Sequence, residues 1–181
     1  MAKKSFPRRC LAALGREFNS DKFFSRREKY KRTKNPILRA FYGSYCTRVQ
    51  NRFCAGIPMT AKFDRSVIFP HGISGIYLSV EAKIGSGTVI FQQVTIGSNS
   101  LTGTNRPGAP KIGKNVYIGA GAKIIGGITI GDNVRIGANC VVFEDVPDNS
   151  TVVAARPRII TGRGERDNAF HVVRSREEDL K

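Results

Sequence analysis

Two histidines are the candidates for acid–base chemistry in this chain of 181 residues, and they stand in different surroundings. His71 lies in the sequence FPHGISG, residues 69–75, inside a stretch that otherwise repeats isoleucine and glycine. His171 lies in a polar C-terminal stretch, where we expect a solvated side chain. An imidazole titrates near neutral pH, so a positioned neutral ring is available as a general base. We therefore take His71 as the candidate catalytic base, the alternative being that it only fills a turn.

A six-residue repeat surrounds His71. Its leading positions and the positions four residues further on are almost all apolar. The leading residues are Ile57, Phe63, Phe69, Leu78, Ile84, Ile90, Ile96, Ile112, Ile118, Ile124, Ile130, Ile136 and Val142, and their companions are Ala61, Val67, Ile73, Ala82, Thr88, Val94, Val116, Ala122, Ile128, Val134, Cys140 and Val146. This period indicates short strands joined by tight turns, with three sides to each coil and parallel coils stacked ~4.8 Å apart. An amphipathic β-sandwich would show a period of two and is disfavoured.

Two breaks interrupt the repeat. The first lies between Phe69 and Leu78, directly after His71. The second contains residues 102–111, TGTNRPGAPK, whose Gly, Pro and Thr content predicts a protruding loop. Inserted loops in repeat proteins often carry the binding face, so we expect this loop to contribute to a site. The repeat domain is predicted to span 57–160.

The repeat also places His71 in a column of equivalent positions. His71 stands two residues after Phe69, and Gln92, Ala120 and Ala138 stand two residues after the leading residues of successive coils. These four side chains should stack along one corner, with His and Gln at one end and two alanines at the other. Either Gln92 or a backbone carbonyl is a candidate to orient the imidazole ring.

Residues 1–56 form a basic segment with a different pattern. They hold 15 Lys and Arg against three acids, and so carry most of the net charge of +16. Asn35 is a plausible N-cap with Pro36 in the first turn, and an apolar stripe follows at Ile37, Phe41, Tyr45, Val49 and Phe53. We expect this helix to dock on the first coil as a cap, with a second, shorter helix in DKFFSRREKYKR, residues 21–32. Residues 161–181 are predicted to form a polar, flexible tail.

The remaining composition limits the classes of site and location. Cys10, Cys46, Cys54 and Cys140 show no metal-ligand spacing, so we expect no metal, and Cys140 falls in the buried register of the repeat. The N-terminal apolar patch CLAALG is too short for a secretion signal, which favours a cytoplasmic protein. The basic segment favours an anionic partner.

Three segments carry a family resemblance: FQQVTIG, IGAGAKIIGGITIGDNVRIGANCVV and VPDNSTVVAARPRII. They resemble the hexapeptide-repeat acyltransferases, in the serine acetyltransferase-like subgroup that also includes sugar and polysaccharide O-acetyltransferases. The resemblance implies a left-handed parallel β-helix of about five coils, a homotrimer, and acetyl-CoA as co-substrate between neighbouring subunits. It also implies that a histidine, matching His71, deprotonates an acceptor hydroxyl that attacks the thioester directly.

The resemblance extends to the cofactor and acceptor contacts. The column suits a pantetheine arm, which needs a narrow groove with little side-chain bulk. The predicted coenzyme A contacts are Ser98, Ala120, Ala138 and Arg158, and the two alanines match family contact positions. Arg106 in the extended loop is the candidate for gripping an acceptor carboxylate.

The sequence also departs from the serine acetyltransferase pattern. Gly56 stands where those enzymes have an aspartate that orients the histidine, and Pro70 replaces an acid before it. The extended loop has no histidine, and Ala155 and Arg156 replace a Gly-Val pair. These departures count against serine as the acceptor.

The sequence therefore predicts an acetyl-CoA-dependent O-acetyltransferase with a saccharide hydroxyl as acceptor. The alternative within enzymes is serine O-acetylation, and the alternative outside enzymes is a non-catalytic scaffold that binds an acidic polymer or a membrane surface. Nucleic-acid binding is disfavoured, because helix packing accounts for the aromatics among the N-terminal arginines. We expect weak attraction of residues 1–56 to a membrane, at its inner face.

Overall fold

The computed structural model describes residues 18–63, 66–161 and 164, and its main body is a three-sided coil of short strands. Every strand pairing is parallel, and each side of the coil is one four-stranded sheet. Sheet A contains β2 (Tyr77–Leu78), β5 (Thr95–Gly97), β8 (Lys123–Ile125) and β11 (Val141–Val142). Sheet B contains β1 (Lys62–Phe63), β3 (Lys83–Ile84), β6 (Lys111–Ile112) and β9 (Thr129–Ile130). Sheet C contains β4 (Val89–Ile90), β7 (Tyr117–Ile118), β10 (Arg135–Ile136) and β12 (Thr151–Val152).

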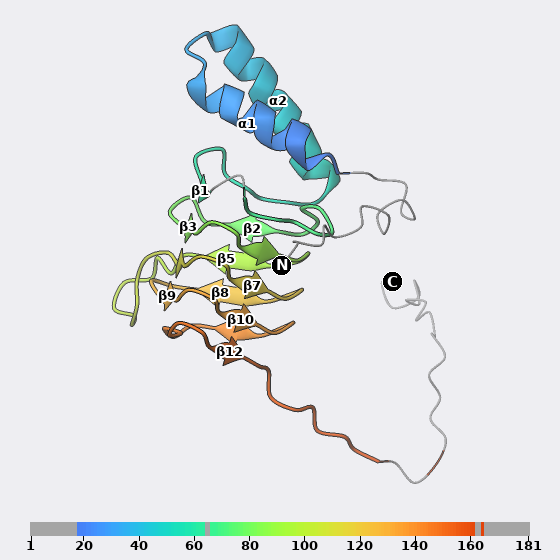
Figure 1. The fold of residues 1–181 in the computed structure, drawn as a ribbon, viewed down its shortest axis with the longest axis vertical. Helices are drawn as coiled ribbons and strands as arrows, with labels where there is room; N and C mark the ends of the chain where they lie inside the picture. Colours follow the sequence, from blue (N-terminus) through green and yellow to red (C-terminus); the bar gives the residue numbers. More distant parts are fainter. Residues whose placement is uncertain (1–17, 64–65, 162–163, 165–181) are drawn as a thin grey trace, which may run out of the picture.

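These sheets form the left-handed parallel β-helix that the repeat and the resemblance predict (Figure 1). Single bridges extend each sheet by one layer: Gly56 pairs with Tyr77, Ile68 pairs with Val89, and Val146 pairs with Ile130. The coil therefore has five layers, as predicted.

The two phases of the repeat form the core. The leading and companion residues are buried, except that Phe63 and Val146 are partly buried. Thr88, the one polar companion, satisfies its hydroxyl by donating to the Gly85 carbonyl at 2.9 Å. Ile76, in the first break of the repeat, is also fully buried and lies outside the six-residue register. The period of six is thus the period at which side chains point into the coil.

A ladder of asparagines turns the chain at the corner between sheets B and C. Asn115, Asn133 and Asn149 have φ angles of 53°, 57° and 58°, in the left-handed region that asparagine tolerates. The Nδ2 of Asn115 donates to Oδ1 of Asn133 at 2.8 Å, and the Nδ2 of Asn133 donates to Oδ1 of Asn149 at 3.1 Å. The ladder joins successive coils at a turn that few side chains can adopt.

A helical hairpin projects from the end of the first coil and packs against it at one end (Figure 1). Helix α1 (Ser20–Arg32) begins at the N-cap Asn19, and α2 (Pro36–Arg52) begins at the predicted N-cap Asn35. Asn35 Oδ1 accepts from the backbone N–H groups of the two residues after Pro36, at 2.9 and 3.2 Å. Both predicted helices are therefore present.

Arg27 fixes the hairpin to the coil. Its side chain is buried, and its Nη2 donates to the carbonyls of Pro58, at 3.2 Å, and Ala61. The guanidinium carbon lies 4.4 Å from the ring centre of Phe63. Burial lowers the pKa of Arg27 below its ordinary value. The contacts couple α1 to the first turn of the coil.

The docking of α2 differs from the prediction. Tyr45, Val49 and Phe53 do pack against the core, but Ile37 and Phe41, at the start of the same stripe, are largely exposed. The helix leaves the end of the coil, so only its last turns lie over it (Figure 1). The aromatic contacts of the cap come mainly from Phe23 and Phe24 on α1 and from Phe18, two residues before that helix. Neither of the two described helices is long and apolar enough to cross a bilayer.

The outer faces of the sheets differ in character. Sheet B carries three exposed lysines in direct register, Lys62, Lys83 and Lys111. Sheet A is more apolar than sheet B: Tyr77 and Val141 are exposed on its strands, and exposed Val80 and Phe143 follow the ends of β2 and β11.

Candidate active site

His71 and Gln92 are in direct contact. His71 Nδ1 lies 2.7 Å from Gln92 Oε1, and the imidazole is exposed at the corner between sheets C and A. An amide oxygen only accepts hydrogen bonds, so Nδ1 carries the proton of the neutral ring. The other nitrogen, Nε2, then keeps its lone pair free for a substrate proton. His71 can therefore act as a general base, with Gln92 as the residue that positions its ring.

The four positions of the predicted column lie one above another. The bridge from Ile68 to Val89 and the pairing of Ile90, Ile118 and Ile136 set the register. Backbone bonds at the corner follow the same order, since Gly121 N–H donates to Gln92 O at 3.0 Å and Asn139 N–H donates to Ala120 O at 2.8 Å. Ala120 is partly exposed and Ala138 is exposed. The column is therefore open, with small side chains below the imidazole.

An aromatic wall stands beside the column. The ring of Phe91 lies edge-on to His71 with centroids 5.3 Å apart, and Tyr117 lies against Phe91 at 5.1 Å. Neither residue was predicted from the sequence. The six-residue repeat could have identified them. Each is next to a buried leading isoleucine, so its side chain must point out of the coil, on the sheet that ends at the corner of His71. The wall gives the column an apolar flank.

Gly56 has no room for an orienting side chain. A Cβ placed there would lie 2.5 Å from Tyr77 Cδ1 and 2.9 Å from its Cε1. The tyrosine ring thus occupies the space beside position 56, where the resemblance puts an aspartate. Gln92 contacts the imidazole from the next coil instead.

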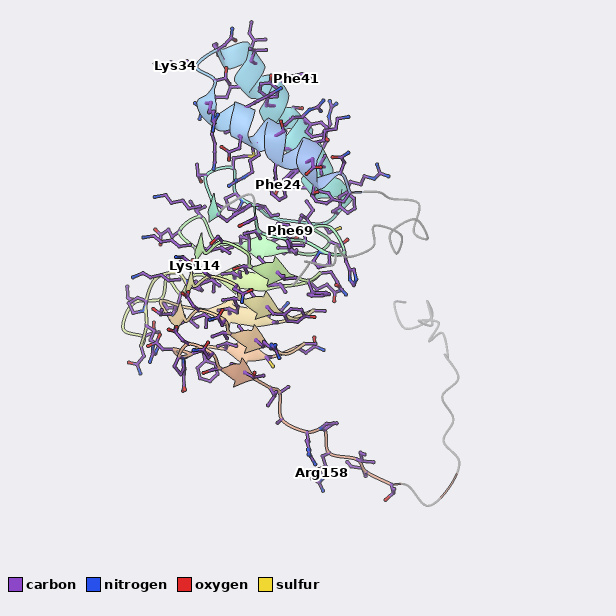
Figure 2. All side chains as sticks on the ribbon, in the orientation of Figure 1. Phe24, Lys34, Phe41, Phe69, Lys114 and Arg158 are labelled. Atoms are coloured by element: carbon purple, nitrogen blue, oxygen red, sulfur yellow. The ribbon has the colours of Figure 1, made fainter. Side chains whose placement is uncertain are left out.

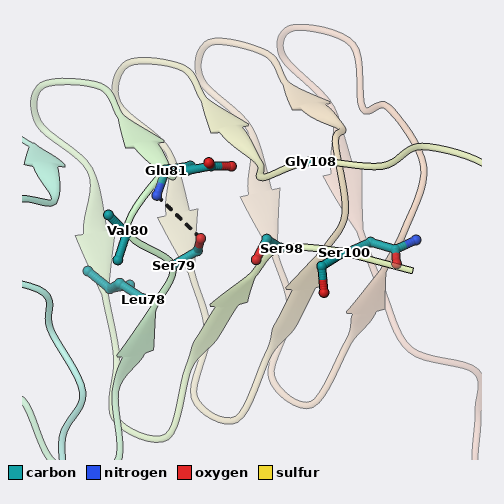
Figure 3. Close-up of a pocket in the computed structure, with 8 residues that line it drawn as sticks. Leu78, Ser79, Val80, Glu81, Ser98, Ser100 and Gly108 are labelled. Carbon is teal, nitrogen blue, oxygen red and sulfur yellow. Dashed lines mark hydrogen bonds between the residues drawn. The ribbon is translucent and has the colours of Figure 1, made fainter. Parts of the chain in front are cut away.

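Ser98 lies at another corner, in a pocket of about 590 Å³ between sheets A and B (Figure 3). Its walls come from the turns after β2 and β5 and from the extended loop, and its polar groups include Glu81, Ser98 and Ser100. His71 is not among the residues that line it. Within one chain, the structure therefore does not bring Ser98 together with the column.

Arg106 is engaged elsewhere. The loop folds toward the last coils: Asn99 and Gly108 form an antiparallel bridge, and Gly127 N–H donates to Arg106 O at 2.8 Å. The Arg106 guanidinium meets the Asp145 carboxylate at 2.6 Å, with both side chains exposed. A hydrogen bond from Arg106, with a second from Thr129 N–H, lowers the pKa of Asp145. In this chain Arg106 is thus not beside His71.

Arg158 lies on the extended segment that follows β12. Figure 2 shows its side chain well away from the coil and from the column. His171 and Cys10 lie outside the described residues. Of the predicted site residues, the structure groups His71, Gln92, Ala120 and Ala138, while Ser98, Arg106 and Arg158 lie apart from them.

Comparison with known proteins gives a consistent picture. Residues 109–144 match the family described as bacterial transferase hexapeptide (six repeats). A serine acetyltransferase of Staphylococcus xylosus is 40% identical over 141 residues, which is 77% of this chain and 61% of that protein. The chain spans less than two thirds of the length of the curated relatives it matches.

Solved structures agree in fold. Serine acetyltransferase isoform 3 of Entamoeba histolytica, in complex with cysteine, has a TM-score of 0.65 at 27% identity, covering 81% of this chain and 52% of that chain. A serine acetyltransferase in complex with CoA has a TM-score of 0.60 at 27% identity, covering 79% and 57%. The chain is thus a hexapeptide-repeat protein similar to the serine acetyltransferases.

Proposed function

We propose that the protein is an acetyl-CoA-dependent O-acetyltransferase whose general base is His71. The observation that carries the proposal is the hydrogen bond from His71 Nδ1 to Gln92, because it leaves Nε2 as the acceptor at an exposed corner above two alanines. The similarity to serine acetyltransferases, one of them in complex with CoA, supports the reaction class and the co-substrate. The cytoplasmic location expected from the sequence is part of this proposal.

The reaction needs one base and no metal. Nε2 of His71 removes the proton of the acceptor hydroxyl as its oxygen bonds to the thioester carbonyl carbon. The resulting tetrahedral intermediate collapses by breaking the carbon–sulfur bond. The imidazolium then returns the proton to the leaving thiolate, so the enzyme ends in its starting state. Gln92 holds the ring in the correct tautomer throughout.

Serine is the acceptor that we propose. The relatives are named serine acetyltransferases, whereas the expected saccharide acceptor has no support among them. Arg106 is the proposed contact for the serine carboxylate, and this role requires the guanidinium to leave Asp145.

A closed threefold assembly would complete the site. Sheet A, which carries exposed Tyr77 and Val141, lies between the corner of His71 and the corner of Ser98. In a ring with sheet A toward the axis, the histidine corner of each copy meets the loop corner of the next. We propose that coenzyme A lies between these corners, with Ser98, Ala120, Ala138 and Arg158 as its contacts. Sedimentation equilibrium gives the molar mass of the assembly and so tests the predicted trimer.

The decisive experiment compares acceptors and removes the base. We expect coenzyme A release from acetyl-CoA with L-serine, and much slower release with neutral sugars or acidic oligosaccharides. The substitution His71→Ala lowers kcat by about 10²-fold or more with little change in the KM for acetyl-CoA. A saccharide that outperforms serine overturns the acceptor, and an unchanged kcat in His71→Ala overturns the base.

A further inference from the structure

The helical hairpin ends in a tip that the coil does not use. We define the hairpin tip as residues 29–41, the last turn of α1, the connection, and the first turns of α2. Figure 2 shows Lys34 at the end of the hairpin farthest from the coil. Contacts that hold the hairpin to the coil, from Arg27, Phe24 and Phe53, lie at its other end. The tip is thus free to contact something outside the coil.

Apolar side chains are exposed on the tip. Ile37 is 78% exposed, Phe41 is 58% exposed and Leu38 is 46% exposed. The three stand within one and a half turns of the same helix, so they form one patch rather than scattered residues. An aliphatic pair beside an aromatic ring on a projecting element is a costly surface in water, which points to a partner.

The same tip is strongly basic. It contains Lys29, Lys31, Arg32, Lys34 and Arg39 and no acidic residue. All five are exposed. Of these, Lys31 pairs with Glu28 at 3.3 Å, and Arg39 and Lys29 lie over the rings of Tyr30 and Tyr42. The hairpin tip thus combines exposed cations with an exposed apolar patch, a combination typical of segments that lie in the interface of an anionic membrane.

We propose that the hairpin tip docks the protein on an anionic lipid surface, with Ile37, Leu38 and Phe41 entering the headgroup region and the cations contacting lipid phosphates. A second copy of the tip is a poor partner, because two such surfaces repel each other. A nucleic acid would use the aromatic ring for stacking and leave the aliphatic pair in water. An anionic lipid surface matches both features of the tip. Its acyl chains can contact the aliphatic side chains, and its phosphates can contact the cations.

A tryptophan reporter tests insertion directly, because the chain contains no tryptophan. We substitute Ile37→Trp in one full-length variant and Ile159→Trp in another. Ile159 is equally exposed but lies after the last strand, far from the tip. With vesicles of equimolar phosphatidylcholine and phosphatidylglycerol, the emission of Ile37→Trp shifts to the blue and is quenched by brominated acyl chains. Ile159→Trp shows neither effect. An Ile37→Trp emission that ignores the vesicles overturns the proposal.

Vesicle flotation with matched variants separates the tip from general charge. Ile37→Ser with Leu38→Ser, and separately Lys34→Glu, lower binding to the mixed vesicles by about tenfold. Lys83→Glu makes the same charge change on sheet B and alters binding by less than about twofold. Equal losses of vesicle binding in Lys34→Glu and Lys83→Glu would show a general charge effect and overturn the assignment of lipid binding to the hairpin tip. All variants keep residues 1–17.

Two further outcomes bear on the proposal. If the tip variants lose binding to a single-stranded oligonucleotide while vesicles fail to bind the unmodified chain, the surface serves nucleic acid and the lipid proposal is wrong. Acetyl transfer measured without vesicles is unchanged in the tip variants, since none of the substituted residues lies in the column. The lipid proposal therefore fails or stands independently of the proposed reaction.

Discussion

Gln92 Oε1 lies 2.7 Å from His71 Nδ1, and the two residues belong to successive coils of the β-helix. The amide fixes the imidazole without placing a charge beside it. An aspartate or glutamate in the same place would stabilise the imidazolium as well as orient the ring. Substitutions of Gln92 can therefore separate the effect of the partner's charge from the effect of ring orientation.

The first prediction concerns this neutral partner. In Gln92→Glu, the acid limb of the kcat/KM profile moves to higher pH by about one unit, because the carboxylate favours the protonated ring. In Gln92→Leu, kcat falls while the limb stays in place, since only the orientation is lost. A profile that is identical in Gln92→Glu and the unmodified protein would show that the contact is not made during catalysis.

The second prediction concerns the small side chains of the column. Ala120→Leu raises the KM for acetyl-CoA by about tenfold or more, because a branched side chain fills the open corner where we place the pantetheine arm. The control Ala120→Gly keeps the corner open and leaves that KM within about twofold. Steady-state kinetics with acetyl-CoA as the varied substrate decide the matter, and an unaltered KM in Ala120→Leu places the cofactor elsewhere.

The third prediction concerns Arg106 and Asp145. The hydrogen bond from Arg106, and then that from Thr129 N–H, lowers the pKa of Asp145, so this contribution to folding is present above the ordinary pKa of Asp and is lost as the pH falls through the lower folded value. In Arg106→Ala the Asp145 carboxyl therefore titrates at higher pH than in the unmodified protein. Carbon-13 NMR of that carboxyl measures the change, and Arg106→Lys gives an intermediate value.

The same pair tests the role of Arg106 toward the acceptor. If Arg106 must leave Asp145 to bind serine, Asp145→Asn lowers the KM for serine and Arg106→Ala raises it. The KM for acetyl-CoA stays constant in both variants. Effects of equal size on the two substrates would assign Arg106 to the loop or to an interface instead.

The fourth prediction concerns the asparagine ladder. Asn133→Ala loses two side-chain hydrogen bonds and forces alanine into the left-handed region, so it lowers the free energy of unfolding by about 2 kcal/mol or more. Asn133→Gly keeps the conformation and loses only the ladder, which costs about 1 kcal/mol. Urea denaturation checks both values, and equal stability of the two variants would show that the turn angle carries no strain.

The core of the fold was predictable because its cause is local. A strict period of six identifies which side chains point inward, and the buried residues follow that period from Ile57 to Val142. The stacking of His71 over Gln92 then follows from counting residues within coils. Ile76 could not be found this way, because it lies in a break where the count is lost.

The parts that could not be predicted depend on contacts between distant segments. The loop bends toward Asp145 through a positive φ of 60° at Arg106, and nothing in its local sequence specifies that direction. The exposure of Ile37 depends on how the hairpin sits on the coil, and the described contacts that hold α1 there include those of Arg27 with residues 58 and 61, far along the chain. The ring of Tyr77 over Gly56 is likewise a contact between neighbouring coils. The sequence alone favoured a saccharide acceptor because of the departures at Gly56 and Pro70, and the proposal of serine rests instead on the names of the relatives.

The coils stack in the order of the sequence, and this order has a consequence for folding during synthesis on the ribosome. In the regular part of the coil, each strand pairs with a strand only 18 residues away, as Tyr117 does with Arg135. The capped first coil is also the first to be translated, because the hairpin and its contacts on residues 58–61 precede all other turns. Each newly synthesised coil can thus pair with a coil that has already folded. Until β12 is added, only the last folded coil has unpaired strand edges. The chain can fold at the pace of translation, from the cap downward.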